Sequence, residues 1–215
     1  EQAYNFAIHA GSARSVTLLM YLKDELRVPW HSVVLDPLKN KSGPIWHCRV
    51  PMSEAGDAEY YAYQVDGPVE GAALPWHFFD PEKILLDPYS RSIFFPECFN
   101  REAARSPGSN AGRAPLGRLG VCRCPFDWGN EPRIRHGSDL VIYEMHVRGF
   151  TRDPSSNVDA SNRGTFAGVV EKIPYLKELG VTAVELMPVF QFDPEDNNYW
   201  GYMPLNFFSP HHAYS

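Results

Sequence analysis

The stretch Asp139 to Val147 reads DLVIYEMHV, and the stretch Val181 to Val189 reads VTAVELMPV. Both are nearly continuous apolar runs, a pattern typical of strands that are buried on both faces of a parallel sheet. Between them, Phe166 to Leu179 repeats apolar residues with the period of a helix, and Gly180 follows where a glycine commonly ends one. Strand, helix and strand joined by a short turn predict a βαβ unit, which implies a parallel sheet.

The rest of this part of the chain is short for a complete α/β barrel. A closed (β/α)8 barrel takes about 250 residues, and far fewer follow Gly137. No third buried strand is evident after Val189, and Phe207 to Ser215 carries aromatic residues and histidines without a helical pattern. We therefore expect residues 138–215 to form the beginning of a (β/α)8 barrel that is incomplete in this chain.

The amino-terminal part of the chain reads as short strands separated by turns. Its β-prone runs alternate apolar and polar residues or are bounded by Gly and Pro, which predicts an antiparallel β-sandwich over residues 1–95. Turn signals then dominate residues 96–137, which we expect to be a linker laid over both domains. The predicted strands are Ala3–Ala10, Ser15–Tyr21, Ile45–Val50 and Glu59–Val65.

Composition narrows the class of ligand. The chain has 20 Lys and Arg against 26 Asp and Glu, a formal charge of −6, which argues against a nucleic-acid partner. No run of eighteen apolar residues is present, so no membrane span is expected. The irregular spacing of the cysteines favours free thiols over disulfides or a zinc site. These are Cys48, Cys98, Cys122 and Cys124.

The loop after the second buried strand holds the candidate site residues. It is acidic at first and then aromatic, with Tyr199, Trp200 and Tyr202 around Gly201. Active sites of parallel α/β folds lie at the carboxyl ends of the strands, and an aromatic ring beside a glycine can present its face to a ligand. The alternative is a loop that packs its own aromatic side chains.

Three motifs of the second part carry a family resemblance: VIYEMHVRGFT (Val141–Thr151), GVTAVELMPV (Gly180–Val189) and NYWGYMPLNFFSP (Asn198–Pro210). In this order they resemble the α-amylase superfamily, and within it the isoamylase-type debranching enzymes. YNFAIHAGSARSVTLLMY (Tyr4–Tyr21) is similar to the family's early-set, glycogen-binding-type β-sandwich module. LDPLKNKSGPIWH (Leu35–His47) and ILLDPYSRSI (Ile84–Ile93) resemble plant and algal isoamylases in particular.

The resemblance implies hydrolysis of α-1,6 branch linkages in amylopectin or glycogen by a retaining mechanism, which uses two carboxyl groups. The family's catalytic carboxylates follow later barrel strands, so no catalytic residue is assigned within residues 1–215, and this segment alone is expected to be inactive. Tyr202 matches the family tyrosine that stacks on the sugar at the cleavage site, with Trp200 and Tyr199 as weaker candidates. No cofactor is implied. Bacterial relatives in the family bind calcium through a longer, Glu- and Asn-bearing loop after the second strand. Here that loop is short and residues 191–194 replace most of those oxygen donors, so no metal is expected.

The resemblance also sets the expected partners and two alternatives. The partner is an α-glucan polysaccharide, and the protein could form a homo-oligomer or pair with a related isoamylase subunit. The likeness to plant enzymes implies the plastid stroma, and otherwise the cytoplasm. The alternatives are a glucan branching enzyme, or a trehalose-releasing relative, and a non-catalytic glucan-binding partner subunit of the same family.

Other charged and aromatic residues receive structural interpretations. We expect Glu144 and Arg148 to form an ion pair at the strand end, His146 to be a hydrogen-bonded core histidine, and Glu185 to point into the barrel interior. The neighbours His211 and His212 could bind a metal only with further ligands. Four tryptophans are expected in the sandwich core or at a domain contact rather than on a second glucan surface, namely Trp30, Trp46, Trp76 and Trp128.

Overall fold

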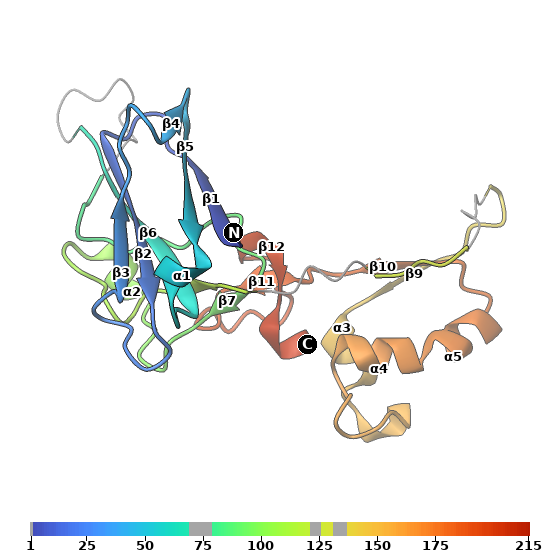
Figure 1. Cartoon of the computed structure of the whole chain (residues 1–215). Coiled ribbons are helices and arrows are strands. Elements are labelled where there is room, and N and C mark those ends of the chain that lie inside the picture. The colour runs from blue at the N-terminus through green and yellow to red at the C-terminus, as the bar shows by residue number, and fades with distance from the viewer. Residues whose placement is uncertain (1, 69–78, 121–125, 131–136) are drawn as a thin grey trace. The chain divides into compact units, whose positions relative to one another are not determined.

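The computed structural model describes residues 2–68, 79–120, 126–130 and 137–215 (Figure 1). The chain divides into two compact units, Glu1–Val121 and Cys122–Ser215. Within the described ranges, the helices are all too short or too polar to cross a lipid bilayer.

The first unit is an antiparallel β-sandwich, as the sequence predicts (Figure 1). One sheet has the strand order β1-β5-β4 and the other β3-β2-β6-β8-β7, and the described strand pairs of both sheets are antiparallel. A short helix, α1, follows β5. The bounds are β1 (Ala3–His9), β2 (Ser15–Tyr21), β3 (His31–Val34), β4 (Lys41–Ser42), β5 (Ile45–Pro51), α1 (Met52–Ala55), β6 (Tyr60–Asp66), β7 (Ile93–Phe94) and β8 (Leu116–Arg118).

The main core of this unit lies between the two sheets and follows the alternation of the strand sequences. β5 buries Trp46, Cys48 and Val50, while the side chains between them are more exposed. The indole Nε1 of Trp46 donates to the Ala10 carbonyl at 3.0 Å, so the one polar atom of this large buried side chain is satisfied. Burial of such apolar faces against each other is what holds a sandwich together.

The first unit extends to Val121 rather than to residue 95. Part of the expected linker adds β8 to the edge of β6 and also forms the helix α2 (Glu102–Arg105). A buried Tyr61 hydroxyl donates to the Asp87 carboxylate at 2.8 Å, and the Asn110 side chain bonds both the N–H and the carbonyl of Ile84. The Asn110 contacts hold the residues after α2 against Ile84, which belongs to a second cluster of buried residues together with Tyr60 and Leu116.

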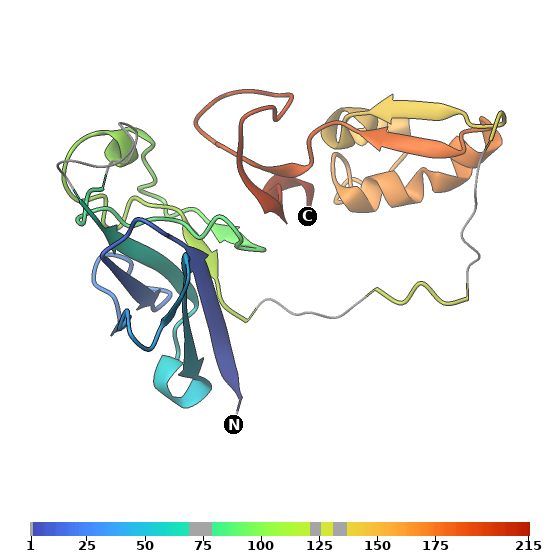
Figure 2. The same ribbon diagram turned by 90° about the horizontal axis from the view of Figure 1, so that it is seen from above.

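The second unit contains the predicted parallel βαβ unit. β9 (Ile142–Met145) pairs in parallel with β10 (Ala183–Leu186), and Met145 lies opposite Leu186 at their carboxyl ends. The helices run along one side of this pair (Figures 1 and 2). The connection comprises α3 (Val147–Thr151), the 3-10 helix η1 (Pro154–Ser156), α4 (Phe166–Glu171) and α5 (Ile173–Glu178).

Three details of this unit correct the sequence predictions. The single helix expected over Phe166–Leu179 is divided at Lys172, because Pro174 has no N–H to continue the hydrogen-bond ladder and instead occupies the first turn of α5. β9 and β10 are shorter than the apolar runs from which they were predicted. They are also not buried on both faces, since Ile142 is 56% exposed in a sheet of two strands.

The last part of the chain forms a hairpin that the sequence did not indicate. β11 (Phe190–Phe192) pairs antiparallel with β12 (Pro204–Pro210), with irregular register on both sides of Gln191. The 3-10 helix η2 (His212–Tyr214) follows. The buried side chains of β11 and β12 are polar, so no apolar alternation marks them as a strand pair: they are Gln191, Asn206 and Ser209.

Candidate functional site

The candidate site lies at the carboxyl edge of the two parallel strands. Because Met145 of β9 and Leu186 of β10 are paired, His146 and the segment that begins at Met187 leave the sheet at the same edge. This is the edge at which parallel α/β folds place their sites. The aromatic loop, defined as residues 198–202, belongs to the connection between β11 and β12.

The backbone of the aromatic loop is a tight turn built on Asn198 and Gly201. The Asn198 side-chain oxygen accepts the Trp200 N–H at 3.0 Å, and the Asn198 carbonyl accepts the Gly201 N–H at 3.3 Å. Gly201 has φ 78°, a conformation that side chains with a Cβ rarely adopt. A Cβ there would also stand 3.0 Å from the Phe192 ring. A glycine between Trp200 and Tyr202 is therefore required by the turn.

His146 connects this loop to α3. It is buried and occupies the N-cap of α3, where its Nδ1 accepts the Gly149 N–H at 3.1 Å. Its Nε2 lies 2.9 Å from the Tyr199 carbonyl oxygen and 3.2 Å from the Tyr214 hydroxyl. The prediction of a hydrogen-bonded core histidine is confirmed.

The three predicted site residues lie together and differ in what covers them. The Tyr199 ring stacks on His146 with centroids 4.4 Å apart and an interplanar angle of 14°, and the Trp200 ring stands edge-on to both. Trp200 is half exposed, so its ring is not packed beneath the loop. Tyr202 is 61% exposed and is the freest of the three to contact a ligand.

A buried polar group supports the hairpin beside the loop. The Gln191 amide nitrogen lies 3.1 Å from Nδ1 of His211, and its oxygen accepts the His212 N–H at 2.9 Å. The His211 ring also stacks on Phe192 at 3.8 Å. Burial, followed by the neighbouring His212 and Arg148, lowers the pKa of His211 to about 4, so this ring is neutral near pH 7. Burial lowers the pKa of His212 as well.

The remaining acidic and histidine candidates do not form a catalytic or metal group here. Glu144 and Glu185 are exposed, and in the described part of the chain no salt bridge joins Glu144 to Arg148. The expected ion pair between Glu144 and Arg148 is therefore wrong. That Glu185 points into the barrel interior stays a prediction, because β9 and β10 form a sheet of only two strands. His211 and His212 each contact Gln191, and within the described ranges no cluster of three or more His, Cys, Asp or Glu has the geometry of a metal site.

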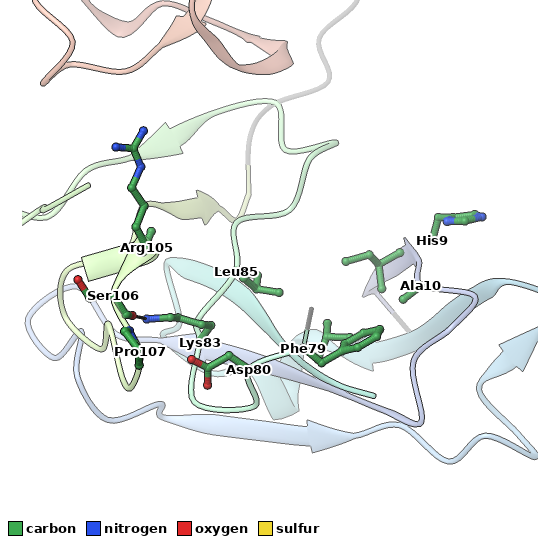
Figure 3. A pocket seen from close by; sticks show the side chains of 12 residues that line it. His9, Ala10, Phe79, Asp80, Lys83, Leu85, Arg105, Ser106 and Pro107 are labelled. Atoms are coloured by element: carbon green, nitrogen blue, oxygen red, sulfur yellow. Dashed lines mark hydrogen bonds between the residues drawn. The ribbon is translucent and has the colours of Figure 1, made fainter. Parts of the chain in front are cut away.

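The first unit contains a cavity of about 720 Å³ (Figure 3). Its polar groups are already engaged in local structure. The buried Lys83 ammonium donates to the carbonyls of Ala103, Ser106 and Gly108, and the Asp80 carboxylate accepts the Glu82 N–H. Arg105 points away from the cavity in Figure 3. This arrangement indicates a structural role for the charged groups at the cavity wall.

The tryptophans and cysteines of the described part have divided roles. Trp46 is in the core, whereas Trp30 is 57% exposed, and Trp128 is exposed and packs edge-on against Phe126 at 4.8 Å. Cys48 is buried and Cys98 exposed, and both are free thiols, as expected. Burial raises the pKa of the Cys48 thiol to about 11. The other residues with an expectation lie outside the described residues: Trp76, Cys122 and Cys124.

Sequence reasoning missed the parts of the site that connect distant segments. It named His146 but not its partners Tyr199 and Tyr214, which lie 53 and 68 residues further along the chain. Sequence reasoning considered His211 only as a metal ligand that would need further partners, and it did not identify the contact of His211 with Gln191. The available signal was a glutamine flanked by two phenylalanines, since an amide placed among apolar residues needs a hydrogen-bond partner when it is buried.

Two family matches cover most of the chain. Residues 1–90 match the family described as carbohydrate-binding module 48 (isoamylase N-terminal domain). Residues 147–206 match the α-amylase catalytic domain. The chain is 39% identical over its whole length to the chloroplastic isoamylase 3 of Oryza sativa subsp. japonica. Over 98% of its length it is 37% identical to the glycogen operon protein GlgX homolog of Mycobacterium tuberculosis.

A solved structure has a similar fold. The catalytic module of SpuA, a multi-modular glycogen-degrading pneumococcal virulence factor, matches 98% of the chain with a TM-score of 0.70 and 27% identity. The fold and the matches thus define a chain that has a carbohydrate-binding module 48 followed by the start of an α-amylase catalytic domain. Within that class, the chain is similar to the chloroplastic isoamylases. It spans 29% of the rice isoamylase, 30% of the GlgX homolog and 30% of the SpuA chain.

Proposed function

We propose that this chain is the front part of a glycoside hydrolase that cleaves α-1,6 branch linkages of amylopectin or glycogen. The proposal is supported by the likeness to the isoamylases and the GlgX homolog over nearly the whole chain. It is further supported by the position of the aromatic loop at the carboxyl edge of two parallel strands. In this proposal residues 138–215 supply one wall of the glucan-binding cleft.

The observation that carries the proposal is the exposure of Tyr202 within a loop whose other residues are anchored. Tyr199 is stacked on His146 and the turn at Gly201 is fixed, yet the Tyr202 ring has 61% of its surface free. An aromatic face can pack against the C–H surface of a sugar ring, and such contacts dominate recognition where charges are absent. Tyr202 is the proposed stacking residue, with Trp200 and Tyr199 beside it.

The chemistry of the proposed reaction needs groups that these residues do not supply. A retaining glycosidase places a nucleophilic carboxylate and an acid/base carboxyl group about 5–5.5 Å apart across the scissile bond. We assign no residue of 1–215 to either role and propose that both belong to a part of the barrel beyond residue 215. The expected role of the present chain is therefore to bind and orient the glucan.

The test uses the complete protein that carries this chain. Replacing Tyr202 by Phe keeps the aromatic face, and replacing it by Ala removes that face. If Tyr202 stacks on the sugar, reducing-end release from amylopectin falls strongly for Tyr202→Ala and only slightly for Tyr202→Phe. Equal loss in both variants would mean that the hydroxyl, and not the ring face, is what matters, and unchanged rates in both would remove Tyr202 from the site.

Partners and location follow from the same family likeness. We propose α-glucan polysaccharide as the partner, with a homo-oligomer or a complex with a related isoamylase subunit as the assembly. We propose the plastid stroma as the location, which the chloroplastic isoamylases support, whereas the bacterial GlgX homolog is the reason to retain the cytoplasm as the alternative. Fractionation of source cells, with detection of the protein in stroma or cytosol, decides between them.

A further inference from the structure

We propose that His146 is the positioning residue of the aromatic loop: as a neutral imidazole with its hydrogen on Nε2, it sets the place of Tyr199 and thereby of Trp200 and Tyr202. The inference rests on the proposed sugar-binding role of the loop and adds a positioning residue to it. Loop position, and with it glucan binding, depends on the hydrogen bonds and the ring stacking of one buried histidine.

The hydrogen-bond partners determine the tautomer of His146. The Gly149 N–H can only donate, so Nδ1, at 3.1 Å, accepts and carries no hydrogen. The Tyr199 carbonyl can only accept, so Nε2, at 2.9 Å, carries the hydrogen and donates. An imidazolium would carry a hydrogen on Nδ1 that faces the Gly149 N–H. The full set of contacts is therefore available only to the neutral ring.

Packing connects the aromatic loop to the His146 ring through Tyr199. The Tyr199 ring lies flat on His146, 4.4 Å away, and its hydroxyl reaches over α3 to Gly149. A Cβ built on Gly149 would come within 2.5 Å of that hydroxyl oxygen. Tyr199 is thus held at its backbone and its ring face, and its hydroxyl occupies the space that a side chain at position 149 would need. Because the turn from Asn198 to Gly201 is tight, a shift of Tyr199 displaces the two residues that follow.

Tyr214 adds a further contact to this ring. Its hydroxyl lies 3.2 Å from Nε2, and burial raises the pKa of that phenol, so it is neutral. In the described part of the chain no salt bridge joins His146 to a carboxylate. The position of the ring therefore depends on its hydrogen bonds and on its stacking with Tyr199.

Two variants of His146 separate its capping role from its positioning role. His146→Asn keeps a side-chain oxygen that can accept the Gly149 N–H at the N-cap, but it has neither the ring nor a donor that reaches Tyr199. His146→Gln keeps a donor near the position of Nε2 and loses the cap. If His146 had only a structural role, both variants would lose glucan binding in proportion to their loss of thermal stability.

The measurement is an NMR titration of this chain with maltoheptaose, in which the Trp200 indole and Gly201 amide signals are followed. We expect His146→Asn to keep an unfolding midpoint near that of the parent, to shift both signals before any sugar is added, and to lose roughly tenfold in affinity, equivalent to about 1.4 kcal/mol. We expect His146→Gln to bind better than His146→Asn although it unfolds earlier. Unmoved loop signals in His146→Asn, or affinities that follow the midpoints, would overturn the inference.

A second pair of variants tests the same contact from the Tyr199 side. Gly149→Ala places a methyl group against the Tyr199 hydroxyl, so it is expected to move the loop signals as His146→Asn does. Tyr199→Phe removes that oxygen, and the next atoms near the added methyl group belong to His146 at 3.7 Å and beyond. The double variant Gly149→Ala/Tyr199→Phe should therefore restore the signals and the affinity. A double variant that is no better than Gly149→Ala contradicts the proposed contact.

The two proposals fail separately in these experiments. If maltoheptaose moves no loop signal of the parent chain, the sugar-binding role of the loop is wrong, whereas sugar-free signals that still move in His146→Asn sustain the positioning role. If the parent binds maltoheptaose and His146→Asn binds it equally well with unmoved signals, the binding role stands and the positioning role is wrong.

Discussion

At the scale of single residues, the candidate site combines anchored and free aromatic side chains. Tyr199 and Trp200 have rings against His146, whereas Tyr202 presents most of its surface to solvent. Such a difference allows a loop to be rigid and still have a free face for a ligand. It also means that Tyr202 can be replaced with little effect on the fold, because an exposed side chain loses few contacts when it is removed.

We predict that Tyr202→Ala in the complete protein lowers the specificity constant for amylopectin by roughly tenfold or more, since a lost aromatic contact costs on the order of 1 kcal/mol or more. The thermal unfolding midpoint should stay close to that of the parent. Initial rates and calorimetry on the same preparations measure both quantities. A large fall in the midpoint with unchanged specific activity would show that Tyr202 is a packing residue.

A second prediction at this scale concerns acid. The pKa of His211 is about 4 in the folded chain, below the value of about 6.5 for an unperturbed histidine, so the unfolded state binds a proton that the folded state does not. Stability of the second unit should therefore fall as the pH is lowered from about 6.5 towards 4, and His212 contributes in the same direction. The urea midpoint of the β11 and β12 amide signals measures it.

The control for the acid prediction is a histidine of the first unit. His9 is exposed, so His9→Gln should leave the pH dependence of the β11 and β12 signals unchanged. A variant at His211 should flatten the dependence, because the titrating group is gone. A midpoint that is equally steep in acid without His211 would assign the effect to another group.

At the scale of elements, the sequence predicted those that have an apolar pattern. β2 was predicted over its observed bounds because it is a continuous apolar run between turn residues, and β5 was predicted to within one residue because its buried residues alternate. The βαβ unit and the glycine after α5 were also predicted correctly. β8 was not predicted, because it has three residues with a glycine at its centre. β11 and β12 were not predicted, because the side chains that they bury are polar.

The candidate site was predictable only in part for the same physical reason. Tyr199, Trp200 and Tyr202 are adjacent in sequence, so their clustering could be read directly. His146 reaches the loop only through the parallel pairing of β9 and β10, which fixes the edge from which both depart. Contacts between distant segments depend on register, and single-sequence patterns indicate strands better than they indicate register.

The end of α5 gives an element-scale prediction. Gly180 has φ 86°, with the Val181 N–H bonded to the Leu176 carbonyl and its own N–H bonded to the Lys177 carbonyl. This pattern requires a left-handed residue at position 180. We predict that Gly180→Ala lowers the free energy of unfolding by about 1 kcal/mol. Chemical denaturation followed by helical circular dichroism measures the change.

Gly180→Asn is the matched variant for this prediction. No atom lies within 4 Å of a Cβ built at position 180, so crowding does not contribute and only the backbone conformation matters. Asparagine tolerates the left-handed region better than alanine, so Gly180→Asn should lose less stability than Gly180→Ala. Equal losses in the two variants would mean that the backbone conformation at Gly180 is not what the substitution disturbs.

At the scale of the whole molecule, a carbohydrate-binding module 48 precedes the first strands of an α-amylase domain. The two parts form separate compact units, and the apolar strands of the second unit expose side chains such as Ile142. We predict that these 215 residues alone release no reducing ends from amylopectin, because no catalytic carboxylate is assigned among them. Measurable release by the purified chain would contradict that assignment.

The proposed activity predicts a change in one kind of bond. Anomeric proton NMR of amylopectin incubated with the complete protein distinguishes α-1,6 from α-1,4 linkages. We predict that the α-1,6 signal falls, the α-1,4 signal stays constant and reducing ends appear in equal number to the lost branches. An α-1,6 signal that rises would indicate a branching enzyme, one that stays constant would indicate a non-catalytic partner subunit, and either result would contradict the debranching function.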